Sequence, residues 1–148
     1  DDALRVHRVV HYAEMAFAYR HYLARGRDTL FPATVTALDE GKNILAGDYF
    51  AALETRTSLN GDLNDIFSHY DAILTPAAPG PAPEGLGTTG SPAFNAIWTF
   101  CGTPAITLPL LTAPNGLPVG VQLVARCGDD ANLLRTATWL SSMLSSTA

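Results

Sequence analysis

The fold is decided by the stretch CGTPAITLPLLTAPNGLPVGVQLVARCGDDANLL, residues 101–134. Its apolar residues predict two strands, over 104–110 and 118–126, and the turn-forming pair Asn115-Gly116 between them predicts an antiparallel hairpin. Both faces of these strands are largely apolar, which is typical of interior strands that helices cover on both sides. The stretch holds no evident nucleophile, base or metal cluster, so its sequence raises the question of what the hairpin supports.

Two longer helices and one more strand are expected upstream of the hairpin. Apolar residues at helical spacing predict an amphipathic helix over 6–24, which Gly26 would end, and a second helix over 49–67 with Asp48 as its N-cap. A short apolar strand is expected over 72–75. The residues after it form a Pro/Gly-rich loop without periodicity, and such a loop in the middle of a domain usually has a function.

Two further helices flank the hairpin. Ser91, which precedes a proline, is a good N-cap for a short helix over 92–100, and Gly102 would close that helix after Cys101. A last helix is expected to begin at a cap formed by Asp129 or Asp130. Its apolar residues recur at helical spacing: Leu133, Leu134, Ala137, Leu140 and Leu144.

These elements predict an α/β layer structure. Three strands that are apolar on both faces need helical layers and neighbouring strands, and alone they leave open edges that invite pairing. We therefore expect them to be part of a larger sheet. At 148 residues and 47% hydrophobic composition, the chain is long enough for one compact unit over 1–148 and too short for two.

Composition narrows the classes of partner and location. The net charge is −5, and no basic stripe interrupts this balance, so nucleic acid is an unexpected partner. No apolar run approaches the roughly 18 residues that span a bilayer, and the start, DDALRVHRVV, is acidic where a signal peptide would be basic. A soluble, cytoplasmic protein without membrane partners is expected. Cys101 and Cys127 are expected as reduced, half-buried thiols, with a bridge between them as the alternative.

Motifs for metal or nucleophilic chemistry are weak. His7 and His11 lie four residues apart with Glu14 three further on, a spacing that can bind a metal. No third ligand of matching geometry follows, so solvated surface histidines are the preferred interpretation and no metal or cofactor is expected. Ser91 lies in TTGSP, which resembles a serine turn superficially, but the following proline explains it better as a helix cap.

The short helix after the Pro/Gly-rich loop is the part most suited to contacting a ligand. Phe94, Asn95 and Trp98 place two aromatic rings and an amide on it, and such residues line ligand clefts. Core packing of Trp98 is the alternative interpretation. Asp71, which precedes the first strand, is expected to be structural.

Four segments together resemble a known family. GDYFAALETR, YDAILTPAAPGPAP, FNAIWTFCGTPAITLPL and NGLPVGVQLVARCGDDANLLRTATWL are similar, in this order and spacing, to the C-terminal third of the amidase signature family. The resemblance covers residues 47–140. It implies a mixed central sheet flanked by helices, of which this chain would be the C-terminal segment.

The resemblance also implies a reaction. Family members hydrolyse carboxamides with a serine nucleophile, a second serine in a cis peptide and a lysine base, and backbone amides form the oxyanion hole. The corresponding Gly-rich Ser-Ser motif and catalytic positions lie upstream of the matching segment, so no catalytic residue carries over to this chain. Lys42 is the only lysine, and the surrounding DEGKN predicts a polar, exposed turn.

In this family the segment resembling 75–102 closes over the substrate pocket. The residues expected to form that wall, for a small-molecule amide substrate, are Thr75, Phe94, Asn95, Trp98 and Thr99. The strand pair and last helix would complete the sheet beneath it.

Two functions follow from the resemblance. The chain is expected to be the sheet-completing and pocket-forming part of an amidase, inactive alone, associating with the N-terminal portion of the same enzyme or with itself. The alternative is a non-catalytic binding or assembly module derived from the fold. A start without methionine and inside an expected helix favours the first interpretation.

Overall fold

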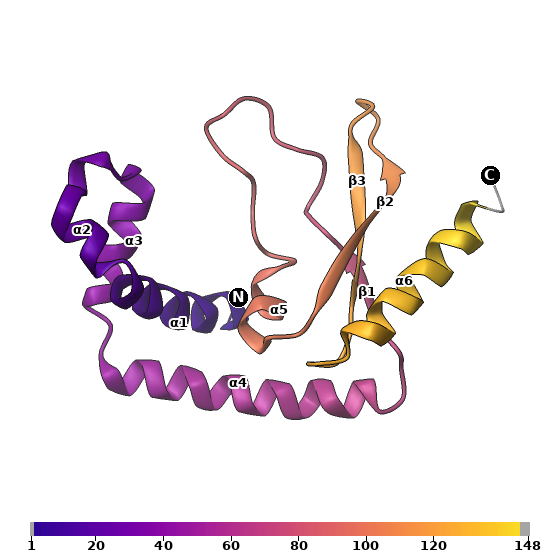
Figure 1. Cartoon of the computed structure of the whole chain (residues 1–148), viewed down its shortest axis with the longest axis horizontal. Helices are drawn as coiled ribbons and strands as arrows, with labels where there is room; N and C mark the ends of the chain where they lie inside the picture. The colour runs from indigo at the N-terminus through magenta and orange to yellow at the C-terminus, as the bar shows by residue number, and fades with distance from the viewer. Residues whose placement is uncertain (1, 146–148) are drawn as a thin grey trace. The chain divides into compact units, whose positions relative to one another are not determined.

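A computed structural model describes residues 2–145, which divide into two compact units between Ser58 and Leu59. The prediction of a single unit over 1–148 that belongs to a larger amidase domain stays a prediction. The division falls within a single long helix. The elements in chain order are shown in Figure 1: α1 (Asp2–Ala18), α2 (Arg20–Gly26), η1 (Arg27–Thr29), α3 (Pro32–Lys42), α4 (Ala46–Phe67), β1 (Ile73–Pro76), α5 (Ala96–Cys101), β2 (Ala105–Thr112), β3 (Pro118–Val124) and α6 (Asp130–Ser145).

The first unit is helical, and its first helix differs from the expectation over 6–24. The helix is interrupted at Tyr19, whose ψ of 7° departs from helical geometry, so that α1 and α2 replace one helix. The amide of Tyr22 then bonds the carbonyl of Tyr19 at 3.0 Å, which begins the second helix. The helical spacing of apolar residues continues across this break, because that spacing reports which side chains are buried and does not fix the backbone conformation of a single residue.

The helix α3 is absent from the sequence expectations. Its Thr, Val and Gly residues have modest helix propensity, and the available signal was Pro32, which occupies a first-turn position where proline is favoured. Lys42 therefore ends a helix and does not lie in a turn, which corrects the expectation. Its exposed ammonium lies 3.7 Å from the carboxylate of Asp39.

The helix α4 begins three residues before the expected N-terminus. It starts at Ala46, so Asp48 lies within its first turn and is not the N-cap. An acidic side chain in this turn still favours the helix, because it faces the positive end of the helix dipole. The end of α4 at Phe67 agrees with the prediction.

The second unit contains a three-stranded sheet of order β1-β3-β2, with both pairs antiparallel (Figure 1). The predicted hairpin is confirmed, and its turn is closed by a bond from the Ala113 amide to the Leu117 carbonyl at 2.9 Å. Within the described residues no fourth strand pairs with β1 or β2, so the outer edges of both strands are open. The α/β prediction is confirmed, and the sheet seen in this chain is antiparallel throughout.

Register aligns the strands into rows that alternate between the two faces of the sheet. Rows on one face are Leu74–Leu123–Ile106 and Pro76–Val121–Leu108; those on the other are Ile73–Val124–Ala105 and Thr75–Gln122–Thr107. The second of these faces carries a row that is polar at all three positions, which differs from the expectation of two largely apolar faces.

The helix α6 packs on the first of these faces. Its Leu133 and Ala137 are buried against Leu123 and Ala125, with Ile106 packed alongside. The helix begins at Asp130, so Asp129 occupies the N-cap position, as one of the two predicted alternatives. This face carries an apolar core cluster of the unit, and Val124 on the other face is also fully buried.

The cysteines flank the hairpin as separate thiols. Cys101 is buried and Cys127 is exposed, and no disulfide joins them, so one thiol is more enclosed and the other more open than the half-buried state expected. Across residues 2–145, no helix combines the length and apolarity that crossing a bilayer requires.

Candidate wall of a substrate pocket

Gln122 organises the polar row of the sheet. It is 3% exposed and is the buried polar residue of the described core. Its Nε2 donates to Thr75 Oγ1 at 3.3 Å and to the backbone carbonyl of Phe94 at 3.0 Å. A buried amide needs such partners, because leaving it unpaired costs about 1–3 kcal/mol. One side chain on β3 therefore ties β1 to the segment that leads into α5.

Asn95 makes a second tie between the same segments. Its Nδ2 donates to the carbonyl of Ala77 at 3.0 Å, directly after β1. The amide of Ala77 in turn donates to the carbonyl of Gly120 on β3 at 3.0 Å. A Cβ at Gly120 would lie 2.3 Å from Cγ2 of Thr107 and 3.0 Å from Cβ of Ala77, so the strands leave no room for a side chain there. The start of the loop is thus held against the polar face.

The helix α5 begins later than expected. The prediction placed it over 92–100 with Ser91 as N-cap, whereas α5 starts at Ala96 after a turn. Ser91 Oγ accepts a bond from the Ala93 amide at 3.3 Å and so caps that turn instead. Asn95 occupies the N-cap position of α5 without a cap bond, because its side-chain amide is directed to Ala77.

The predicted end of this helix is confirmed. Gly102 follows Cys101 in a left-handed conformation with φ of 72°, and the Thr103 amide bonds the carbonyl of Trp98 at 3.1 Å. This closing pattern is one that glycine supports without the cost of a Cβ. It fixes the direction in which the chain leaves α5 for β2.

The five predicted wall residues fall into two groups. Thr75, Phe94 and Asn95 are joined through the bonds of Gln122 and Ala77. Trp98 and Thr99 lie on α5, where Trp98 is half-buried and Thr99 is exposed. The indole Nε1 of Trp98 is buried and has no hydrogen-bond partner within residues 2–145. The bonded group, with Gln122, is the part of the wall that the fold brings together.

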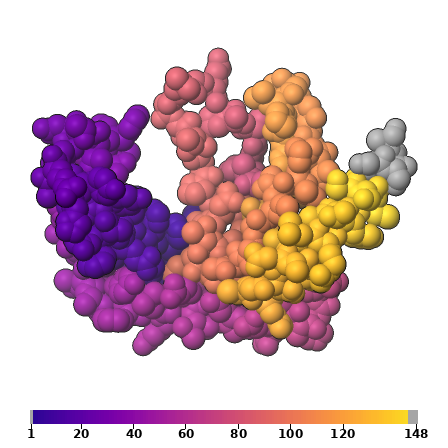
Figure 2. All heavy atoms as spheres, viewed as in Figure 1, coloured from indigo at the N-terminus to yellow at the C-terminus, as the bar shows by residue number. Residues whose placement is uncertain are grey.

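The loop between β1 and α5 stands beside this group. In Figure 2 it is a thin projection next to the β2–β3 hairpin, and its residues 82–93 are exposed. The exposed part includes Leu86, whose side chain packs on nothing among the described residues. The two ends of the loop are tied to the sheet by Asn95 and Ala77, whereas its middle has few contacts.

Gln122 is a residue of the candidate wall that the sequence expectations missed. The alternation along β3 places Gln122 on the face opposite Val121 and Leu123. This placement alone predicts only an ordinary strand residue. The signal was an amide inside an apolar strand, because a polar residue at a buried position must be hydrogen-bonded. Its partners, at 75 and 94, lie too far along the chain to be identified from the sequence.

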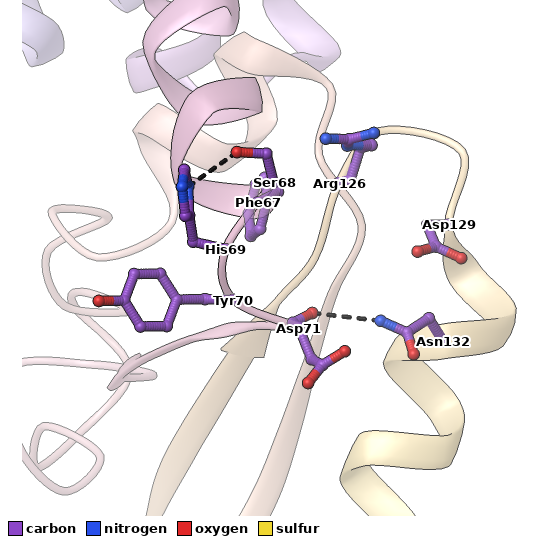
Figure 3. A pocket seen from close by; sticks show the side chains of 8 residues that line it. All are labelled: Phe67, Ser68, His69, Tyr70, Asp71, Arg126, Asp129 and Asn132. Atoms are coloured by element: carbon purple, nitrogen blue, oxygen red, sulfur yellow. Dashed lines mark hydrogen bonds between the residues drawn. The ribbon is translucent and has the colours of Figure 1, made fainter.

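A second concave site lies at the other end of β1 (Figure 3). A cavity of about 240 Å³ is lined by Phe67, Ser68, His69, Tyr70, Asp71, Arg126, Asp129 and Asn132. Asn132 Nδ2 donates to the carbonyl of Asp71 at 3.3 Å, and Ser68 Oγ lies 2.8 Å from Nδ1 of His69. Asp71 therefore lines a cavity, in addition to preceding a strand.

The histidines of α1 form no site of this kind. The rings of His7 and His11 stack with centroids 5.2 Å apart. Burial and the neighbouring His11 hold the pKa of His7 below its ordinary value. Within the described part of the chain, no three metal-ligating side chains converge.

Comparison with known proteins identifies the family. The model of the Amidase family matches residues 6–134. The chain belongs to the amidase family. Over 96 residues it is 36% identical to a glutamyl-tRNA(Gln) amidotransferase subunit of Agathobacter rectalis, a match that covers 60% of this chain and 19% of that protein. The corresponding subunit of Pseudothermotoga lettingae is 38% identical over 97 residues, a match that covers 60% of this chain and 20% of that protein.

Solved structures share the fold. A structure described as a crystal structure of amidase superposes with a TM-score of 0.86 at 26% identity, covering 97% of this chain and 36% of that one. A 6-aminohexanoate cyclic dimer hydrolase bound to its substrate gives a TM-score of 0.74 at 18% identity over 97% of this chain and 35% of its own. The amidase segment thus spans about a fifth of the curated relatives and about a third of these solved chains.

Proposed function

We propose that this chain is the sheet-completing and pocket-forming part of an amidase that hydrolyses carboxamides. Residues outside these 148 would supply the serine nucleophile and the base. Thr75, Phe94 and Asn95 would form the wall that contacts the amide substrate, and Trp98 and Thr99 would extend it along α5. The observation that carries this proposal is the buried Gln122, which bonds both sides of the wall at once.

The bonds of Gln122 support a pocket wall for a physical reason. A binding wall must keep its shape when the substrate arrives, because ordering it at that moment would cost binding free energy. Gln122 uses one nitrogen to fix Thr75 on β1 and Phe94 before α5, and Asn95 fixes the chain after β1. The exposed middle of the loop remains able to adapt to a substrate.

Association with the upstream portion of the same enzyme is the second part of the proposal. The outer edges of β1 and β2 are open within the described residues, and Leu74 on β1 is 60% exposed although its row partner Leu123 is buried. An open edge beside an exposed leucine favours pairing with another strand. The matching relatives are several times longer than the matched segment, which fits a missing partner segment.

Complementation tests the proposal. The chain is purified alone and also co-expressed with the upstream portion of its parent protein, and hydrolysis of a carboxamide panel is followed by ammonia release. We expect no turnover from the chain alone, because losing the catalytic groups of a serine hydrolase removes roughly 10⁶ in rate. Turnover should return when the upstream portion is present. Hydrolysis by the isolated chain would contradict the proposal, and a complex that forms without hydrolysing any amide would favour the non-catalytic assembly module.

Variants of the reconstituted enzyme locate the wall. Asn95→Ala should raise KM, with Asn43→Ala as the matched control, because Asn43 also donates to a backbone carbonyl, at 2.9 Å, but lies in the first unit. Lys42→Ala should leave turnover unchanged, since its exposed side chain pairs with Asp39. A loss of turnover in Lys42→Ala would show that this lysine has a catalytic role.

A further inference from the structure

The cavity of Figure 3 is separate from the proposed wall, because it lies at the start of β1 whereas Thr75 lies near its end. Four segments build it: the end of α4, the residues before β1, Arg126 after β3 and the start of α6. Its volume of about 240 Å³ is slightly below the range of about 300–1,000 Å³ that is typical of drug-sized ligands. A ligand in it would therefore be small and polar.

Charges of both signs line this cavity without neutralising each other. Arg126, Asp71 and Asp129 all line it, and none of the three takes part in an ion pair among residues 2–145. Arg126 and the carboxylates are thus more than 4 Å apart although they share one small space. Figure 3 shows the guanidinium of Arg126 and the carboxylate of Asp129 on neighbouring sides, and the carboxylate of Asp71 directed away from both.

The guanidinium retains donors for a ligand. Its Nη2 donates to the carbonyl of Asn64 at 3.2 Å, which anchors Arg126 to the last turns of α4. A guanidinium has five N–H donors in a fixed plane that matches a carboxylate. The remaining donors can bind a ligand carboxylate without breaking that anchor.

The opposite wall is also held in place. Ser68 Oγ contacts Nδ1 of His69 at 2.8 Å and donates to the carbonyl of Asp65 at 2.7 Å, so both side chains are fixed to the end of α4. Asn132 anchors Asp71 through its backbone carbonyl at 3.3 Å, which leaves the Asp71 carboxylate for other partners. The cavity is therefore built from anchored polar groups.

We propose that this cavity binds a small zwitterion of the α-amino acid type, with its carboxylate at Arg126 and its ammonium at Asp129. A simple anion would lie beside a carboxylate, and a simple cation would lie beside the guanidinium. A molecule that carries an ammonium and a carboxylate on the same carbon pairs with both signs and suits the volume. Binding here requires no amide hydrolysis, so it stands apart from the proposed function.

Calorimetric titration of the purified full chain with three ligands of similar size tests this inference. L-Alanine carries both charges, propionate lacks the ammonium and ethylamine lacks the carboxylate. We expect saturable binding of L-alanine in the millimolar range, because the ion pairs would be partly exposed. Propionate and ethylamine should bind about tenfold more weakly or not at all, since each lacks one pair. Equal binding of all three, or no binding of L-alanine, would overturn the inference.

Substitutions test which residue pairs with each charge of the ligand. Asp129→Asn should weaken L-alanine binding about 3- to 10-fold, and the matched control Asp130→Asn should not, because Asp130 is the adjacent residue and does not line the cavity. Arg126→Lys keeps the charge but lacks the planar guanidinium that matches a carboxylate, so the affinity for L-alanine should fall several-fold. Should either variant fail to fold, as circular dichroism would show, the series of three ligands on the unaltered chain still decides the question.

Chemical-shift mapping separates this cavity from the amidase wall. Titration of the ¹⁵N-labelled chain with L-alanine should shift amides at 68–71 and 126–132. Shifts confined to Thr75, Phe94 and Asn95 would place the amino acid at the proposed wall and overturn the cavity site, while leaving the proposed function standing. Shifts at the cavity residues combined with failed complementation would support the cavity site and contradict the proposed function.

Discussion

The two faces of the three-stranded sheet differ in the interactions that hold them, although the same three strands form both. On the face under α6, Leu123 and Ile106 belong to one row and are packed against Leu133 and Ala137. On the other face, the row Thr75–Gln122–Thr107 is polar, and hydrogen bonds from Gln122 join it to the segment before α5. The first face is apolar and packs against α6, whereas the second combines the fully buried Val124 with directed bonds from Gln122.

This difference shows how a small sheet supports a site. Burial of apolar area is non-directional and tolerates small shifts, whereas hydrogen bonds fix distances and directions. Val124, on the same face as Gln122, is also fully buried, so the directed bonds there act in addition to burial. The comparison predicts that mutations on the α6 face change stability alone, whereas mutations on the polar face change both stability and the shape of the proposed wall.

Truncation of the apolar row should have the largest effect. Leu123→Ala removes a side chain that is 4% exposed and should lower the free energy of unfolding by about 2–5 kcal/mol, through lost burial and a cavity. Leu74→Ala is the control, because it lies in the same row but is 60% exposed. Urea denaturation followed by circular dichroism measures both, and equal losses would show that α6 does not define the core face.

Overpacking of the polar face should come next. Gly120→Ala places a Cβ 2.3 Å from Thr107 and should lower the free energy of unfolding by about 1–3 kcal/mol. Gly61→Ala, within α4 and with nothing near its Cβ, should instead raise it by up to about 1 kcal/mol. The two alanine substitutions are compared by thermal unfolding, and a neutral Gly120→Ala would mean that the strands can separate at this point.

Removal of the buried amide should have a smaller effect on stability and a clear effect on the wall. Gln122→Met keeps the volume but leaves Thr75 and the Phe94 carbonyl without their donor, so a loss of about 1–2 kcal/mol is expected. In the reconstituted enzyme KM should rise more than it does for Thr112→Val, a substitution at the exposed end of β2. An unchanged KM would separate Gln122 from the wall.

Lowering the pH should have the smallest effect on stability, and this effect should arise outside the sheet. The four rows of the sheet contain no titratable side chain, whereas burial and His11 lower the pKa of His7 in the first unit below 6.5. As the pH falls through 6.5, the unfolded chain takes up a proton that the folded chain resists, so stability decreases until the lowered pKa is reached. His7→Gln should flatten the stability profile as the pH falls below 6.5, and an unchanged slope would contradict the assignment.

Local signals in the sequence were enough to predict the hairpin, the end of α5 at Gly102 and the start of α6. These signals are apolar alternation over a strand, turn residues and helix caps, and each acts within a few residues. The interruption at Tyr19 and the start of α5 at Ala96 escaped prediction, because each depends on the conformation or bonding of one residue. Asn95, for example, donates to Ala77 in place of capping the helix.

The polar row and the charged cavity, in contrast, exist only in the folded chain. Thr75 and Gln122 are 47 residues apart, and only the pairing register of β1 with β3 puts their side chains on one face within 3.3 Å. A shift of one residue would have turned Gln122 toward α6, so composition could not have assigned its role. In the same way, Arg126 and Asp71 share a cavity only because β1 and β3 run antiparallel, which brings the end of one strand beside the start of the other.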